Sequence, residues 1–311
     1  MQRIQYDQYG GPEVMRLGNV PIPSPGRGKV RVRVHAASAN PADWGIRKGD
    51  LRLVSGRRFP RAMGHDFAGV VDAAGPGVTR VKPGDEVFGI QGIRNAGAFA
   101  EYLVTGEKNV FPKPSSLSFE QAAALPMAGV TAWSAVVDKA KVKPGQTVFV
   151  TGVLGGVGRA AAQIALLRGA AVRGNCSASG IEEAKALGLR EAWDYRAFNP
   201  ADYPHRFDAV IDPAKALTLA QCNAMLTRGG TAVHVDFPFS TILASLTSSR
   251  HAIAAGSPTT AHMNGIADAA QRGALSPKIA RTVPLADAID ALTELETKGT
   301  PKGKLVITCI P

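Results

Sequence analysis

Four glycines follow an apolar run near the middle of the chain, and their spacing suits a phosphate group. Residues 148–150 are typical of a buried strand, and residues 160–167 are typical of a helix. Glycine has no Cβ, so backbone N–H groups can approach a pyrophosphate closely. The first helical turn adds unpaired N–H groups and the positive end of its dipole. We expect a dinucleotide cofactor here, although a tight turn without a ligand fits the same glycines. The expected contacts are Gly152, Val153, Leu154, Gly155, Gly156 and Val157.

The segment after the next strand bears on the choice of cofactor. An NAD site places Asp or Glu there to bind the ribose 2′-hydroxyl. Residues 173–179 read Arg-Gly-Asn-Cys-Ser-Ala-Ser and contain no acid. The hydroxyls of Ser177 and Ser179, with a nearby arginine, can instead hold a 2′-phosphate, which favours NADP (NADPH). In the alternative interpretation these residues only form the loop and specificity is set elsewhere.

The N-terminal part of the chain is rich in predicted strands. Residues 1 to about 115 contain short strand candidates separated by Gly/Pro turns, which is typical of a barrel-like or sandwich unit. Residues 30–34 alternate valine and arginine, so one face is expected to be buried. Ser118 and Gln121 form a capping-box pattern that predicts a helix start. From Thr147 onward strands and helices alternate, which predicts a parallel sheet with helices on both faces.

The last part of the chain predicts an insertion. Residues 266–271 and 287–298 read as helices, and residues 303–308 read as a final strand. One strand cannot form a domain, so we expect it to pair with the N-terminal β unit. The expected division is residues 1–117 and 257–311 for the outer domain, with residues 118–256 as the inserted nucleotide domain.

Composition narrows the class of partner. The chain has 311 residues, of which 45% are hydrophobic and 20% charged, as in soluble globular proteins. Its net charge of +11 and isoelectric point of about 9.8 favour acidic partners. The basic residues are spread along the sequence and no aromatic-rich RNA motif is present. We therefore expect a solvated basic surface and no nucleic acid partner.

Cysteine usage and hydropathy point to the cytoplasm. The three cysteines form no CxxC pair, which excludes a cysteine-rich zinc lobe and suits a reducing compartment. The N-terminus lacks the apolar core of a signal peptide. The most apolar region, residues 122–137, is interrupted by Pro126, Thr131 and Ser134, so no membrane span is expected.

The order of several motifs resembles the medium-chain dehydrogenase/reductase superfamily, and most closely its zinc-free quinone oxidoreductase branch, the zeta-crystallin type. The motifs that carry this resemblance are Gly-His-Asp-Phe-Ala-Gly-Val-Val at 64–71, Lys-Pro-Gly-Asp-Glu-Val at 82–87, residues 97–102, residues 124–132, the glycine stretch and Gly-Lys-Leu-Val at 303–306. The resemblance implies an α/β fold, with a GroES-like β-barrel catalytic domain and a Rossmann doubly wound parallel-sheet domain. It also implies NADPH in the cleft between them.

The resemblance also implies where a zinc ion would bind in related alcohol dehydrogenases. His65 stands at the histidine-ligand position, Asn40 stands where a cysteine ligand would be, and Met127 stands near the last cysteine. One ligand out of three cannot build a catalytic zinc site. We expect no metal, with His65 as a hydrogen-bonded structural histidine or a cleft-wall group.

Site residues follow from the same resemblance. Asn40 and Asp43 match an Asn-Pro-x-Asp pattern that lines the cleft, where Asn40 can donate to an oxyanion. Asp43 orients neighbours such as Arg47, or only caps a turn. Thr131 matches a residue beside the nicotinamide, or bonds its own backbone. Tyr195 matches a contact to the adenosine side of the cofactor, or is an ordinary half-buried tyrosine.

These features predict an NADPH-dependent reductase of a quinone or an α,β-unsaturated carbonyl. Without a metal a simple carbonyl is poorly polarised, whereas a conjugated acceptor spreads the charge that hydride addition creates. An enoyl-thioester reductase is the alternative enzyme, with the Arg57, Arg58 and Arg61 cluster as a site for carrier phosphates. A non-catalytic NADPH- or RNA-binding protein of the zeta-crystallin type is the alternative of another class.

The chain differs from the quinone oxidoreductase pattern at two positions. Gly45 stands where many quinone reductases have a tyrosine, and a lysine that some relatives place near Gly180 is absent. The first difference affects which acceptor can bind, and the second affects the preference for NADP.

Relatives imply a homodimer or homotetramer, in which an edge strand near Val233 could pair across a two-fold axis.

Overall fold

The computed structural model describes residues 1–56, 58–235, 239–254, 256, 258–299 and 303–310. Residue contacts divide the chain into two compact units. The first comprises Met1–Met127, Met263–Gln271 and Pro277–Pro311, and the second comprises Ala128–His262 and Arg272–Ser276. The second unit therefore interrupts the sequence of the first.

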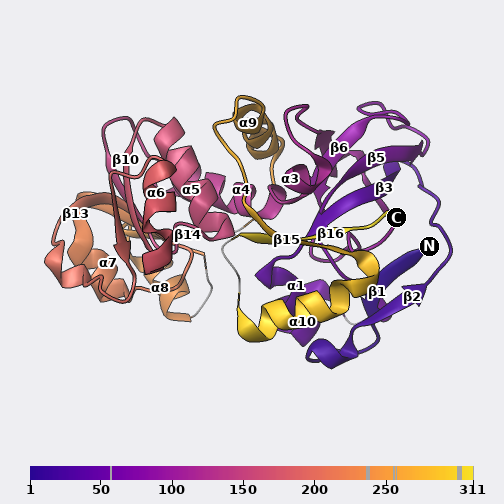
Figure 1. The fold of residues 1–311 in the computed structure, drawn as a ribbon, viewed down its shortest axis with the longest axis horizontal. Helices are drawn as coiled ribbons and strands as arrows, with labels where there is room; N and C mark the ends of the chain where they lie inside the picture. The colour runs from indigo at the N-terminus through magenta and orange to yellow at the C-terminus, as the bar shows by residue number, and fades with distance from the viewer. Residues whose placement is uncertain (57, 236–238, 255, 257, 300–302, 311) are drawn as a thin grey trace. The chain divides into compact units, whose positions relative to one another are not determined.

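The first unit is built on β-sheets (Figure 1). Within the described residues a seven-stranded sheet has the order β15-β16-β3-β5-β6-β8, with β7 also paired to β3, and a smaller sheet has the order β2-β1-β4. The strands are β1 Gln2–Tyr6, β2 Arg16–Asn19, β3 Lys29–Ser38, β4 Arg61–Ala62, β5 Asp66–Ala74, β6 Glu86–Ile90, β7 Tyr102–Gly106, β8 Val110–Pro112, β15 Ile279–Pro284 and β16 Lys304–Thr308.

Hydrophobic alternation explains the central strand of this sheet. Val30, Val32 and Val34 on β3 are fully buried, as their spacing predicts, and they pack into one core with residues of the other strands. The helices of this unit are α1 Pro41–Lys48, α2 Arg52–Ser55, α3 Phe119–Ala123, most of α9 Thr260–Gln271, and α10 Ala288–Lys298. Ser118 caps α3 through the predicted capping box.

The C-terminal strand returns to the N-terminal sheet. β16 pairs antiparallel with β3, with Val306 opposite Ser38 and Thr308 opposite Ala36. β15, which the sequence did not predict, pairs parallel with β16 on its other side. Residues that follow the second unit therefore lie beside the strand that leads into α1.

The second unit is a doubly wound α/β sheet. Its strand order is β11-β10-β9-β12-β13-β14, and each neighbouring pair is parallel. The strands are β9 Thr147–Val150, β10 Ala171–Cys176, β11 Glu191–Asp194, β12 Phe207–Asp212, β13 Leu226–His234 and β14 His251–Ile253. The helices are α4 Pro126–Trp133, continued by π-helical residues Ser134–Lys139, then α5 Gly156–Leu167, α6 Ile181–Ala186, α7 Leu219–Met225 and α8 Phe239–Thr247.

Some predicted boundaries and edges differ from the structure. α3 packs against β3 and β5, so contacts place residues 118–127 with the first unit. The expected boundary after residue 256 meets residue 257, which lies outside the described residues. The expected edge strand near Val233 is wrong, because β13 lies between β12 and β14. In the described part of the chain, β14 and β11 end this sheet.

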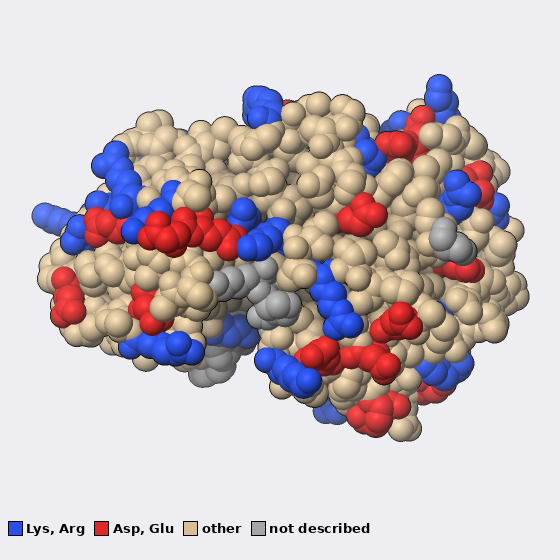
Figure 2. Space-filling model, viewed as in Figure 1, with Lys and Arg blue, Asp and Glu red and all other residues tan. Residues whose placement is uncertain are grey.

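The surface mixes both signs of charge. Figure 2 shows Lys and Arg side chains beside Asp and Glu side chains over the visible face, and exposed ion pairs such as Arg16–Asp7 and Lys185–Glu182 follow the same pattern. No helix within the described residues is both long and apolar enough to cross a membrane.

Candidate active site

The glycine turn joins β9 to α5 with little space for side chains. Gly152 has φ +54°, in the region that favours glycine. A Cβ on Gly158 would collide with the carbonyl oxygen of Gly152. α5 begins with Gly155 at its N-cap, and no side chain caps its first turn. The first N–H groups of the helix have no intrahelical acceptor, so they are available to an anion.

Asn175 at the end of β10 holds the glycine turn in place. Its Oδ1 accepts a hydrogen bond of 2.9 Å from Gly152 N, and its carbonyl oxygen accepts one of 3.0 Å from Val153 N. Gly152 and Val153 therefore shape the turn, since their N–H groups are already bonded. Gly156 and Val157, in the first turn of α5, present the N–H groups that suit a pyrophosphate.

A buried threonine–aspartate pair ties the turn to the neighbouring strand end. Thr151 Oγ1 donates a hydrogen bond of 2.5 Å to Asp212 Oδ1 at the end of β12. Asp212 also accepts hydrogen bonds from the backbone N–H groups of Ala216 and Leu217, at 3.0 and 3.1 Å. The pair fixes the loops that follow β9 and β12 at the carboxyl edge of the sheet, where doubly wound sheets bind ligands.

The predicted nucleotide-specificity residues lie at the ends of β10 and β11. Ser177 Oγ and Ser179 Oγ are 3.4 Å apart, and Tyr195 N donates to the carbonyl oxygen of Cys176 at 2.9 Å. This bond brings Tyr195, which is half exposed, next to Ser177 in the fold. Arg173 is committed to Glu191, with an N–O distance of 2.7 Å. The guanidinium of Arg196 lies 5.1 Å from the centroid of the Tyr195 ring.

In the first unit, the turn into α1 brings predicted residues together. Asp43 Oδ2 accepts a hydrogen bond of 2.7 Å from Asn40 N, and Asp43 Oδ1 lies 2.6 Å from His65 Nδ1. The turn-cap role and the orienting role of Asp43 therefore coexist. The neighbour it orients is His65, whereas the expected partner Arg47 is paired with Glu296 at 2.6 Å.

The Asn40 amide sits in a closed network. Its Nδ2 donates to the Ser38 carbonyl oxygen at 3.2 Å and to Asp66 Oδ2 at 3.0 Å. Its Oδ1 accepts a hydrogen bond of 2.5 Å from Lys304 Nζ, which also donates to the Ala39 carbonyl oxygen. An amide nitrogen has two hydrogens, so both are used here. For Asn40 to donate to an oxyanion, one of these bonds would have to exchange.

Asp66 and Lys304 are charged residues deep in the first unit. Asp66 is fully buried, and its carboxylate also accepts hydrogen bonds of 3.0 and 3.2 Å from Met127 N at the start of α4. Burial raises the pKa of the Asp66 carboxyl to about 6, while the Lys304 charge and the bonds from Asn40 and Met127 oppose that rise. Burial likewise lowers the pKa of the Lys304 ammonium, against the attraction of Asp66 and Asp43.

Sequence reasoning missed these two residues as parts of the site. Asp66 and Lys304 were treated only as members of motifs, although each is the first residue of its strand and stands directly before an apolar run. A charge beside such a run is a usable signal, because buried charges occur with a partner. Thr131 lies on α4 in the second unit and is buried, and the structure describes that unit separately from Asn40 and Asp43.

Comparisons with known proteins agree with this fold. Residues 26–115 match the alcohol dehydrogenase GroES-like domain, and residues 187–307 match the zinc-binding dehydrogenase family. The chain is 32% identical to a quinone oxidoreductase of Sus scrofa, over 99% of this chain and 97% of that protein. It is 36% identical to a 2-methylene-furan-3-one reductase of Solanum lycopersicum, over 68% of this chain and 56% of that protein.

Solved structures of related proteins have the same fold over the whole chain. The quinone oxidoreductase of Coxiella burnetii has a TM-score of 0.90 and 30% identity, covering 100% of this chain and 99% of that one. A protein described as an NAD-dependent alcohol dehydrogenase has a TM-score of 0.86 and 32% identity, with both chains covered completely. This chain belongs to the quinone oxidoreductase family of the medium-chain dehydrogenase/reductase superfamily. It is a quinone oxidoreductase-like enzyme that uses a nicotinamide cofactor and acts on a small molecule.

The side chains that stand at the zinc-ligand positions in this chain do not fit a zinc ion. A catalytic zinc needs three protein ligands, and the Asn40 amide is occupied on both of its polar atoms. The thioether of Met127 is a poor replacement for a thiolate. Within the described residues, no group of three or more His, Cys, Asp and Glu side chains is arranged to hold a metal ion.

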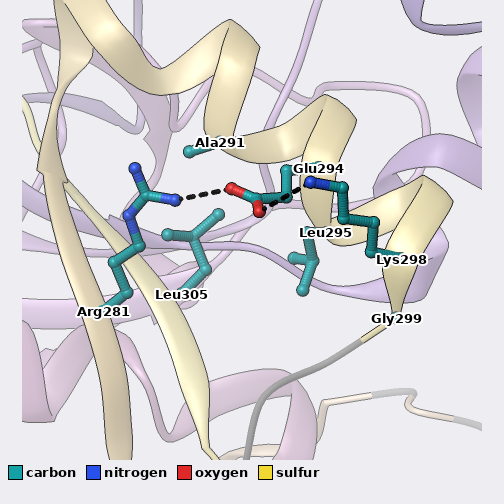
Figure 3. Close-up of a pocket in the computed structure, with 7 residues that line it drawn as sticks. All are labelled: Arg281, Ala291, Glu294, Leu295, Lys298, Gly299 and Leu305. Atoms are coloured by element: carbon teal, nitrogen blue, oxygen red, sulfur yellow. Dashed lines mark hydrogen bonds and ion pairs between the residues drawn. The ribbon is translucent and has the colours of Figure 1, made fainter.

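A separate pocket of about 370 Å³ lies in the first unit of this family member, between α10 and the strands β15 and β16 (Figure 3). Its charged groups are paired, since Glu294 forms ion pairs with Arg281 at 2.9 Å and with Lys298 at 3.3 Å. Ala291, Leu295 and Leu305 supply apolar walls. We place no step of the reaction in it, because its polar groups are already paired with one another.

Proposed function

We propose that this protein is an NADPH-dependent reductase of quinones and α,β-unsaturated carbonyls that works without zinc. The observation that carries the proposal is the closed network of Asn40, Asp66 and Lys304, in which both polar atoms of the Asn40 amide are already hydrogen-bonded. A simple carbonyl there would lack a Lewis acid. A conjugated acceptor needs less polarisation, because its π system carries the developing charge.

The second unit supplies the cofactor side of this proposal. A bound NADPH supplies hydride equivalents, and the chain provides binding and orientation. Gly156 and Val157 hold the pyrophosphate through N–H groups at the start of α5. Ser177 and Ser179 bind the 2′-phosphate, and the half-exposed ring of Tyr195 lies against the adenosine. The lack of an acid at the end of β10 supports NADPH over NADH.

Asn40 and Asp43 are the proposed site residues of the first unit. Thr131, on α4 of the second unit, is proposed to border the nicotinamide. Asp66 and Lys304 keep the Asn40 amide in one orientation, because the ammonium requires an acceptor and the carboxylate requires a donor. Many quinone reductases have a tyrosine where this chain has Gly45. The missing side chain leaves room for larger acceptors.

The relative from tomato favours enones among the acceptors. That protein is named for the reduction of a methylene-furanone, which is an α,β-unsaturated ketone. The enoyl-thioester alternative has lost support, since Arg61 donates to Tyr6 Oη at 3.0 Å and to the carbonyl oxygens of Ser55 and Gly56. Arg57, which completed the expected basic cluster, lies outside the described residues.

Location and assembly complete the proposal. The three cysteines are buried and form no disulfide, which fits a reducing cytoplasm. A homodimer or homotetramer is proposed on the free edge that β14 has in the described part of the sheet. Light scattering on the purified protein tests the assembly.

The decisive experiment follows NADPH oxidation at 340 nm with 1,2-naphthoquinone and with a short enone such as 3-penten-2-one. We expect turnover with at least one of these acceptors, weaker turnover with NADH, and unchanged rates after dialysis against a chelator. Loss of activity on chelation would contradict the zinc-free proposal. Absence of turnover with every acceptor, together with salt-sensitive RNA binding, would favour the non-catalytic alternative.

A further inference from the structure

One atom of the Asn40 network has no partner. Asn40 uses both amide hydrogens and its oxygen, and the two oxygens of Asp43 are bonded to Asn40 N and His65 Nδ1. Asp66 accepts from Asn40 and Met127, and Lys304 donates to Ala39 and Asn40. His65 Nε2, in contrast, is buried with no hydrogen bond.

Such an atom needs an explanation. His65 is 2% exposed, and an unpaired buried polar atom is unfavourable, so a functional state is expected to supply a partner. In the part of the chain that the structure describes, four other buried nitrogens have no hydrogen bond: His35 Nε2, Arg250 Nε, His251 Nε2 and His262 Nδ1. His65 alone is bonded directly to a proposed site residue.

The surroundings of His65 leave Nε2 as the ring nitrogen that can meet a ligand. Asp43 Oδ1 lies 2.6 Å from Nδ1, so Nδ1 is already bonded. The same network contains two acidic side chains, Asp43 and Asp66, and one basic side chain, Lys304. Acidic neighbours favour a donor role for the ring over an acceptor role.

We propose that His65 donates from Nε2 to the acceptor oxygen and is the proton source of the reduction. This inference rests on the proposed reductase function. In the step, the β-carbon of the enone gains the hydrogen and two electrons that the reduced nicotinamide gives up. The π electrons of the C=C bond form a new double bond between the α-carbon and the carbonyl carbon, and the carbonyl π electrons move to the oxygen. The Nε2–H bond breaks, an O–H bond forms on the acceptor, and the neutral imidazole regains a proton from solvent.

Two substitutions separate the two ring nitrogens. In His65→Asn the amide nitrogen can replace Nδ1 and keep the bond to Asp43, but Nε2 is lost. In His65→Gln the amide nitrogen reaches the Nε2 position without the bond to Asp43. We expect kcat with the enone to fall about 100-fold in His65→Asn. In His65→Gln about tenfold of that loss should be recovered, because the amide can donate a hydrogen bond to the oxyanion but leaves the protonation to solvent. The Kd of NADPH, measured by its fluorescence, is expected to stay unchanged in both.

A merely structural histidine predicts the opposite order, with His65→Asn near wild type and His65→Gln the more damaged. That order, or wild-type kcat in His65→Asn, would overturn the proposal. A second measurement needs neither a variant nor turnover. 4-Nitrophenolate, an oxyanion probe, is added to ¹⁵N-histidine-labelled wild-type protein saturated with NADP⁺, and we expect the Nε2 resonance of His65 to shift.

The two measurements also distinguish this proposal from the proposed function. An unshifted Nε2 resonance at saturating probe contradicts the role of His65, even if wild-type protein reduces quinones. A shifted resonance in a protein that reduces no acceptor supports the oxyanion contact and contradicts the reductase function.

Discussion

The ammonium of Lys304 donates a hydrogen bond of 2.5 Å to the amide oxygen of Asn40, from a position 264 residues further along the chain. The lysine enters on β16, which pairs with β3, the strand that leads into Asn40. The same amide donates to Asp66. Lys304 and Asp66 thus fix the uncharged Asn40 side chain between them. The orientation of that side chain depends on both charged partners.

Replacing Lys304 with Met should destabilise the protein by about 3–5 kcal/mol, because Asp66 is then left buried without a counter-charge. The double variant Lys304→Met/Asp66→Asn should be more stable than Lys304→Met alone, since it removes both charges. Urea denaturation measures both effects. The matched control is Lys185→Met, whose exposed pair with Glu182 should be worth less than about 0.5 kcal/mol.

Acid should increase the contribution of Asp66 to stability. The pKa of Asp66 is about 6 in the folded protein against 3.8 for an ordinary carboxyl, so the folded state takes up the proton first as the pH falls. The unfolding free energy of wild type minus that of Asp66→Asn should therefore rise between pH 6.5 and pH 4, by up to about 3 kcal/mol. Denaturant titrations at several pH values measure this difference, and a difference that stays constant or falls with acid would contradict the raised pKa.

An acid at the end of β10 should reverse the cofactor preference. Ser177→Asp places a carboxylate where an NAD site holds the ribose 2′-hydroxyl, and this charge repels a 2′-phosphate. We expect the Kd of NADPH to rise at least about tenfold and that of NADH to fall, measured by fluorescence titration. Ser177→Asn has nearly the same size without the charge and serves as the control. Equal effects of the two variants would show that the charge is irrelevant there.

Gly158→Ala should disrupt the turn between β9 and α5. The new Cβ would meet the Gly152 carbonyl oxygen, and backbone cannot yield as a flexible side chain can. We expect a loss of about 1–3 kcal/mol in stability and weaker binding of NADPH. Gly26→Ala is the control, because a Cβ there has open space. Thermal denaturation and cofactor titration check both variants, and NADPH affinity equal to wild type in Gly158→Ala would remove the glycine turn from the site.

Local signals predicted much of the architecture. The valine alternation of β3, the capping box at Ser118 and the glycine turn each depend on neighbouring residues, and each is confirmed. The pairing of the final strand also followed, because a single strand requires a partner sheet. β15 was missed, since its sequence has no hydrophobic alternation and five of its six residues are at least partly exposed.

Contacts between distant residues were harder to predict. Nothing near Asn40 in the sequence indicates that Lys304 will saturate its oxygen, so its amide was expected to be free for an oxyanion. Arg47 lies one helical turn from Asp43, yet it is paired with Glu296 from α10. Asn175 was read as part of a specificity loop, whereas its side chain holds Gly152. Each of these contacts depends on tertiary geometry that local spacing does not contain.

The inserted second unit has a consequence for synthesis on the ribosome. Asn40 and Asp66 leave the ribosome long before Lys304, which is 264 positions after Asn40. At ordinary translation speeds that interval is on the order of tens of seconds. During this time the nascent first sheet lacks β16 and carries an acid without its counter-ion. The second unit can fold as soon as it emerges. The N-terminal strands remain unpaired with β16 during this time, so chaperones that bind the growing chain should recognise them.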